Sequence, residues 1–209
     1  DNAPTGQVII TQDVKFYNNN SSILFKQDNP VTWSANATAI SFNFTGTEFN
    51  LNGGDKICDA TPGKWYKIVL SADVTSKLCF AKVYDEGGTL LGESDITAFV
   101  NAGATAPVYL CYRTPDNSQG ELDFNNVKVY TPEIDGTKFT TTVADETISI
   151  PEAGESDVTT TLTAKALSTE GYDMIGEATW AFDESVTDTS SIVITPDTTD
   201  SHKATLTVK

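Results

Sequence analysis

The sequence predicts an all-β protein, and three observations lead to this prediction. The 209 residues contain many short segments in which apolar and polar residues alternate, which is the pattern of a half-buried strand. Gly, Pro, Asn and Asp separate these segments, as at residues 52–55 and 85–88, and supply the backbone conformations that hairpins and loops need. Hardly any stretch repeats its apolar residues with the helical period of about 3.6 residues.

The first part of the chain contains seven predicted strands. Each is short, rich in β-branched or aromatic residues, and bounded by turn residues. In chain order they are residues 8–10, 22–25, 39–44, 66–70, 79–84, 108–112 and 127–130. Alternation assigns their faces, so that Ile40, Phe42 and Phe44 form one core stripe. By the same rule, Cys79, Ala81 and Val83 form another.

A domain boundary is predicted near residues 131–133, where Pro132 ends a strand and the composition changes. Residues 1–131 carry nine basic and 14 acidic residues, whereas residues 132–209 carry four and 15. The second part is rich in Thr and contains no Cys. Its predicted strands are residues 147–151, 159–164, 178–182, 191–194 and 204–208. The chain is therefore expected to contain two domains, 1–131 and 132–209.

Both domains resemble known families. Residues 63–70, 78–85 and 121–130 resemble the second half of a jelly-roll β-sandwich of the concanavalin-like or laminin-G-like kind. Residues 134–209 resemble a bacterial immunoglobulin-like domain, in which a strand that ends in a lone Trp, here Trp180, precedes the final strand. The resemblances imply a jelly-roll carbohydrate-binding domain and a smaller immunoglobulin-like β-sandwich that acts as a spacer, with Trp180 in its core.

Charge and hydropathy exclude several classes of partner. With 13 basic and 29 acidic residues the net charge is −16, which repels nucleic acid and anionic membranes. Arg113 is the single arginine, and phosphate or carboxylate sites normally use arginine, so a neutral ligand is expected. No apolar run is long enough to insert into a membrane. No signal peptide is recognisable, so the chain is either cytosolic or a mature piece of a larger multidomain exported protein, and we expect the second, secreted or at the cell surface.

The three cysteines, Cys58, Cys79 and Cys111, fit no zinc-binding spacing. Their odd number permits at most one disulfide bond. A bond between Cys58 and Cys79 is one possibility, and a small core side chain is the other interpretation of Cys79.

Polar and aromatic side chains on outward faces and loops predict a carbohydrate-binding surface. Aromatic rings stack on the apolar face of a sugar, while amide and charged groups bond its hydroxyls. The alternative is that these aromatic residues belong to the core edge or to an interface. In the laminin-G-like pattern, Trp65 packs under the sheet. The predicted ligand-binding residues are Trp33, Tyr17, Phe80, Lys82, Tyr84, Tyr109, Arg113 and Asn43.

Catalysis is not expected. Jelly-roll glucanases use the pattern Glu-x-Asp-x-x-Glu, and residues 93–98 and 121–126 approach it but lack the final Glu that would serve as proton donor. A structural calcium ion is expected at Asp13 and Asp123, with Asn125 or Asn126 adding a carbonyl, unless these are only solvated turn residues.

The predicted function is therefore non-catalytic binding of a neutral polysaccharide, a glucan and more specifically an α-glucan such as starch, in an exported bacterial system. The alternative is a structural or adhesive bacterial surface protein that binds a protein partner. A degenerate glycoside hydrolase is a third possibility, which would need two carboxylates facing one cleft.

Overall fold

The computed structural model describes residues 6–27, 37–114, 121–143, 151–152, 156–175, 180–181, 190–198 and 203–209. The regular secondary structure of these described residues consists of β-strands, which confirms the predicted all-β class. By its internal contacts the chain divides into two compact units, Asp1–Pro132 (unit 1) and Glu133–Lys209 (unit 2). None of the described residues forms a helix long and apolar enough to cross a membrane.

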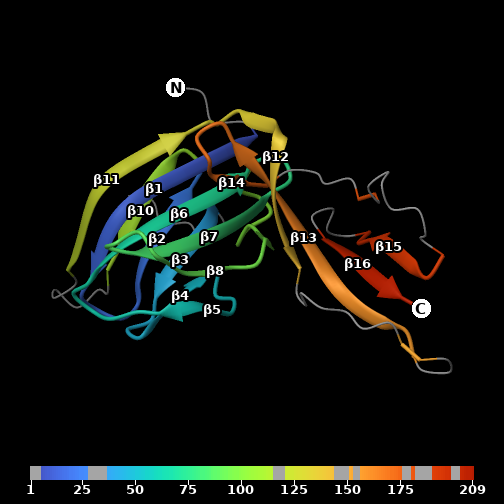
Figure 1. The fold of residues 1–209 in the computed structure, drawn as a ribbon. Coiled ribbons are helices and arrows are strands. Elements are labelled where there is room, and N and C mark those ends of the chain that lie inside the picture. Colours follow the sequence, from blue (N-terminus) through green and yellow to red (C-terminus); the bar gives the residue numbers. More distant parts are fainter. Residues whose placement is uncertain are drawn as a thin grey trace. The chain divides into compact units, whose positions relative to one another are not determined.

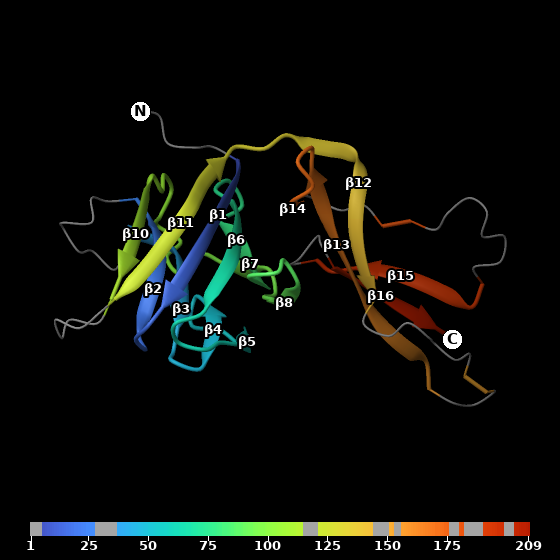
Figure 2. The ribbon, with the colours of Figure 1, turned by 60° about the vertical axis from the view of Figure 1, so that its left-hand side comes forward.

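Unit 1 consists of two antiparallel sheets that face each other (Figures 1 and 2). Sheet A has the order β11 (Leu122–Tyr130), β1 (Gln7–Phe16), β6 (Trp65–Asp73), β7 (Leu78–Asp85) and β8 (Leu90–Glu93), and the short β9 (Thr97–Ala98) also pairs with β7. Sheet B has the order β10 (Tyr109–Arg113), β2 (Ser21–Lys26), β3 (Thr38–Phe44), β4 (Glu48–Leu51) and β5 (Lys56–Asp59).

The core of unit 1 lies between the two sheets, because alternate residues of each strand turn inward. Both predicted core stripes are confirmed, since the buried core cluster includes Ile40, Phe42 and Phe44 of β3 and Cys79, Ala81 and Val83 of β7. The short strands β4, β5 and β8 were not predicted, although β4 supplies a central core residue, Phe49.

Phe49 packs against four other aromatic rings. Its centroid lies 5.0 Å from that of Tyr66, 5.1 Å from Phe42, and 5.6 Å from both Phe16 and Phe44. The Tyr66 ring meets Phe49 edge-on, and its hydroxyl accepts a hydrogen bond from the Thr61 backbone N–H at 2.8 Å. This cluster fixes the inward face of β6 at Tyr66, and the neighbouring Trp65 must therefore face outward.

The two sides of the sandwich differ. On one side, β8 approaches β5 so closely that a Cβ atom on Gly92 would lie 2.2 Å from the carbonyl oxygen of Ile57. On the other side, Phe124 of β11 is 53% exposed, although it pairs with the core residue Val14. The first side is closed by backbone contact, and the second leaves apolar side chains accessible.

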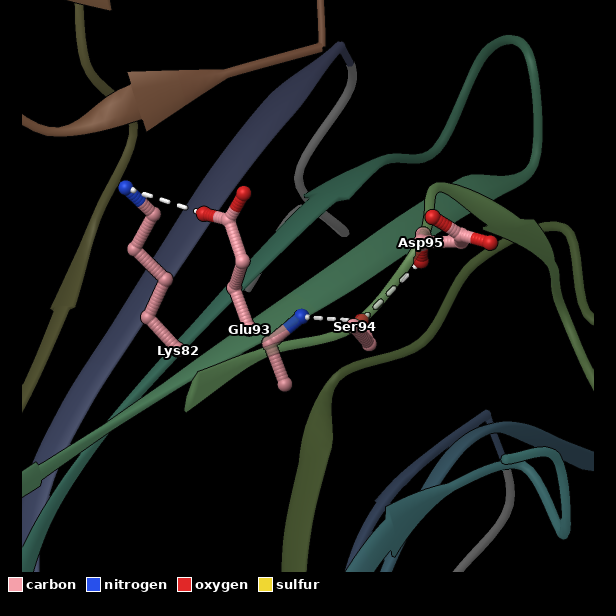
Figure 3. A network of polar contacts seen from close by, with 5 residues as sticks. Lys82, Glu93, Ser94 and Asp95 are labelled. Atoms are coloured by element: carbon pink, nitrogen blue, oxygen red, sulfur yellow. Dashed lines mark hydrogen bonds and ion pairs between the residues drawn. The ribbon is translucent and has the colours of Figure 1, made fainter. Parts of the chain in front are cut away.

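A polar network joins β7 to the segment that contains β8 (Figure 3). The Lys82 ammonium lies 3.3 Å from Oε2 of Glu93. The backbone N–H of Ala81 donates to Oγ of Ser94 at 2.9 Å, and this hydroxyl donates to the backbone oxygen of Asp95 at 3.0 Å. These contacts fix the edge of sheet A.

Unit 2 contains one antiparallel sheet among its described residues. Its order is β12 (Ile134–Val143), β13 (Val158–Ser168), β16 (Lys203–Val208) and β15 (Ile192–Pro196), and β14 (Asp173–Met174) also pairs with β13. Most of the predicted strands 147–151 and 178–182 lies outside the described residues. Trp180 is half-buried.

All three cysteines are free thiols, so the possible bond between Cys58 and Cys79 is not formed. Cys58 and Cys79 are buried, whereas Cys111 is half-buried on β10. Burial raises the pKa of Cys58 to about 11 and that of Cys79 to about 12. Both thiols are therefore protonated near neutral pH and serve as core side chains.

Candidate functional site

The residues predicted to form one sugar-binding platform belong to two different sheets. Phe80, Lys82 and Tyr84 lie on β7 in sheet A, whereas Tyr109 and Arg113 lie on β10 in sheet B. The outward faces of two sheets packed over one core point in opposite directions. The prediction of a single platform is therefore wrong.

Two of the three predicted residues on β7 have other roles in the structure, one as a buried side chain and one in an ion pair. Phe80 has no exposed surface, so its prediction as a stacking residue is wrong. Its strand lies inside sheet A, where residues on both faces of β7 are buried at this point. Lys82 forms the ion pair with Glu93.

On sheet B, the Asn43 side chain is hydrogen-bonded to two neighbouring side chains. Its Nδ2 donates to Oδ1 of Asn50 at 2.9 Å, and its Oδ1 accepts from Oγ of Ser41 at 2.8 Å. Asn43 pairs in register with Ser22, which pairs with Arg113, and these residues line a shallow depression of about 420 Å³. Most of the hydrogen-bonding capacity of the Asn43 side chain is thus used within the sheet.

A better candidate site lies at one end of sheet A. Two adjoining hollows of about 350 and 530 Å³ share Trp65, Tyr66, Asp85 and Glu86. The first hollow is also lined by Asp13, Lys67, Gly88 and Asn125, and the second by Gly63, Lys64, Gly87 and Leu91. Because the Tyr66 ring packs into the core, Trp65 is the aromatic side chain available to both hollows.

The prediction that Trp65 packs under the sheet is wrong. Trp65 pairs with Lys15 of β1, and its half-buried ring lies on the same outward face as Lys67 two residues later. The signal was present in the alternation of β6, in which Tyr66, Ile68 and Leu70 fill the core. Trp65 and Tyr66 are adjacent on the strand, so one of the two side chains must face outward, and Tyr66 occupies the core position.

Lys15 connects the aromatic residues at this end of the sheet. Its ammonium lies 4.9 Å from the ring centroid of Trp65 and 5.3 Å from that of Tyr17. It also lies 3.3 Å from Oδ2 of Asp123, which accepts a hydrogen bond from the Tyr17 hydroxyl at 2.7 Å. The hydrogen bond from Tyr17, followed by the Lys15 ammonium, lowers the pKa of Asp123. Contacts with Tyr17 and with Asp123 raise the pKa of Lys15.

Tyr84, the remaining predicted aromatic residue of sheet A, lies beside the same region. It pairs in register with Lys67, whose ammonium lies 6.0 Å from the Tyr84 ring centroid. Lys67 lines the first hollow. The predicted Trp33 lies outside the described residues.

The two predicted calcium ligands lie on neighbouring strands. Asp13 pairs with Asn125 of β11, and its Oδ2 accepts a hydrogen bond from the Asn126 side chain. Asp123 faces the Lys15 ammonium instead. Among the residues that the structure describes, no group of three or more His, Cys, Asp or Glu side chains could hold a metal ion. Calcium binding stays a prediction.

Comparisons with known proteins leave the family of this chain open. No protein-family model matches the sequence, and no curated protein matches it. Among solved structures, a chain named "Sialidase" matches with 14% sequence identity and a TM-score of 0.34, over 60% of this chain and 13% of the other. A match at this level defines neither the fold nor the activity of the protein.

Proposed function

We propose that unit 1 binds a neutral polysaccharide without catalysis, and that the ligand lies in the hollows beside Trp65. The observation that carries this proposal is the outward position of the Trp65 ring between two hollows lined by polar side chains. Hollows of a few hundred Å³ match the size of sites that hold small ligands.

The chemistry of the lining supports a sugar. The Trp65 ring offers a flat apolar surface for the C–H face of a sugar ring. Around it, Asp13, Asn125, Asp85 and Lys67 supply acceptors and donors that match sugar hydroxyls. The three carboxylates of the first hollow and the net charge of −16 disfavour an anionic polymer. A glucan, and more specifically an α-glucan such as starch, remains our proposed ligand, and the exported, extracellular location remains part of the proposal.

The absence of catalysis is part of the same proposal. Glu93, which opens one of the two glucanase-like segments, is paired with Lys82, and Asp123, in the other, is paired with Lys15. The hydrogen bond from Tyr17, followed by the Lys15 ammonium, lowers the pKa of Asp123, so this carboxylate is a poor proton donor.

The test is affinity electrophoresis of the full chain against soluble starch, solubilised xylan and pectin, with a pull-down on insoluble starch and cellulose. We expect retardation by a neutral glucan, and loss of that retardation in Trp65→Ala with an unchanged unfolding transition. If no polysaccharide retards the wild-type chain, the proposal is wrong.

A second function, adhesion to a protein partner, is favoured by a different observation. Several apolar side chains on and beside the edge strands β10 and β11 are exposed, including Val129 at 56% and Phe124 at 53%. Contiguous exposed apolar surface is typical of protein interfaces. Failure of every polysaccharide would make this the leading function.

A further inference from the structure

We propose that Lys15 is a positioning residue, which fixes the Trp65 ring in the orientation that receives the sugar. This inference rests on the proposed function of the hollows beside Trp65. It goes further because it assigns a role to a residue that contacts neither hollow.

The register of sheet A places Lys15 in the middle of a row of three residues. On one side it pairs with Trp65 of β6, and on the other with Asp123 of β11. Residues directly opposite each other on antiparallel strands have Cβ atoms about 5 Å apart, so a long side chain can contact both neighbours. The backbone therefore delivers a lysine between an acid and a tryptophan.

The Lys15 ammonium is held in place from the β11 side. It lies 3.3 Å from Oδ2 of Asp123, and the Lys15 side chain is only 21% exposed. The same oxygen accepts the Tyr17 hydroxyl at 2.7 Å. Because one carboxylate oxygen receives both groups, Asp123 fixes Lys15 and Tyr17 relative to each other.

From that fixed position, the ammonium contacts two aromatic rings. The distances of 4.9 Å to the Trp65 centroid and 5.3 Å to the Tyr17 centroid are within the range of about 6 Å over which a cation is attracted to a ring face. The attraction depends on the orientation of the ring, so it favours one rotamer of Trp65 over the others.

Lys15 lines neither of the two hollows that include Trp65. A lysine that bonded the sugar directly would have to line one of them. The effect of Lys15 on binding is therefore expected to be indirect. Because Lys15 orders the Trp65 ring before the sugar binds, it lowers the free-energy cost of ordering that ring on binding.

The test measures how tightly three variants of the full chain bind whichever of soluble starch, solubilised xylan and pectin retards the wild-type protein. Lys15→Met keeps the length of the side chain but removes the charge, and Lys15→Arg keeps the charge and the ability to stack. Lys56→Met is the matched control, because Lys56 also pairs with an aspartate, Asp59 at 2.6 Å, but on sheet B. We expect about three- to tenfold weaker binding for Lys15→Met, recovery in Lys15→Arg, and no change for Lys56→Met.

A second readout reports on the ring itself. In a Trp33→Phe, Trp180→Phe background, Trp65 is the remaining tryptophan, and its fluorescence anisotropy measures how freely the ring moves. We expect lower anisotropy in Lys15→Met and wild-type anisotropy in Lys15→Arg. If Lys15→Met does not fold, Asp123→Asn replaces it, since loss of the carboxylate releases the ammonium and should change anisotropy and affinity in the same direction.

The two proposals fail in different ways. If the wild-type chain binds a polysaccharide but Lys15→Met leaves both affinity and anisotropy unchanged, the positioning role is wrong and the proposed function stands. Weaker binding with unchanged anisotropy also contradicts positioning, because it indicates direct contact. If the wild-type chain binds none, the proposed function is wrong, and positioning for sugar binding is wrong with it.

Discussion

Tyr112 and Phe124 stack face to face, although one belongs to sheet B and the other to sheet A. Their ring centroids are 4.3 Å apart and their planes differ by 5°. The Tyr112 hydroxyl also reaches across the sandwich and donates to Oε1 of Gln12 at 2.6 Å. This pair joins the edge strands β10 and β11, on the side of unit 1 opposite the close approach of β8 to β5.

Tyr112→Phe should destabilise unit 1 by about 1–3 kcal/mol, because it leaves the oxygen of the buried Gln12 side chain without its donor. Urea unfolding measures the change. The control is Tyr109→Phe on the same strand, where the side chain is 40% exposed and we expect a negligible effect. Equal stability of the two variants would show that the hydrogen bond from Tyr112 contributes nothing.

Gly92→Ala should be destabilising, because the new methyl carbon would lie 2.2 Å from the Ile57 carbonyl oxygen and force β8 away from β5. Overpacking of this kind costs about 1–3 kcal/mol. The matched control is Gly87→Ala in an exposed turn, where the nearest atom is a side-chain oxygen of Asp85 at 3.3 Å. A thermal unfolding midpoint unchanged by Gly92→Ala would mean that the two strands are not in close contact.

The cysteines should react with a thiol reagent in a fixed order. At pH 8, Cys58 and Cys79 remain protonated because burial raises the pKa values of these thiols to about 11 and 12. Only Cys111, which is half-buried, should be modified readily in the native chain, and all three should react in denaturant. Only one reactive thiol in denaturant would indicate a disulfide bond and contradict the structure.

Asp123 should contribute stability that depends on pH. In the folded chain the pKa of Asp123 lies below its ordinary value of 3.8. At any pH well above that ordinary value, the carboxylate is charged in both the folded and the unfolded chain, and its contribution to stability is complete. As the pH falls from the ordinary pKa through the lowered one, the unfolded chain binds the proton first and the contribution disappears. The difference in unfolding free energy between the wild-type chain and Asp123→Asn should therefore decrease in acid, and a difference independent of pH would contradict the assignment.

Alternation within single strands predicted the parts of the fold that depend on one strand at a time. The stripes of β3 and β7 were correct because each alternates cleanly over several residues. The four-residue strands β4, β5 and β8 offer too few alternations to be recognised, and Leu90, Leu91 and Gly92 do not alternate at all.

The candidate site could be predicted only in part, since it depends on register between strands that are distant in sequence. Tyr17 and Tyr84 were found as outward or loop aromatic residues, but the contact of Lys15 with Trp65 and Asp123 exists only once β1 is aligned between β6 and β11. Phe80 was misassigned because alternation does not report that both faces of a strand are buried.

The central claim is that the sugar binds at the outward face of sheet A beside Trp65, and not at sheet B. The most direct measurement compares retardation of the wild-type chain, Trp65→Ala and Tyr109→Ala by one soluble glucan, after circular dichroism has shown that both variants are folded. We predict that Trp65→Ala loses retardation and that Tyr109→Ala keeps it. If Trp65→Ala is still retarded by the glucan, whether or not Tyr109→Ala is retarded, this account is contradicted.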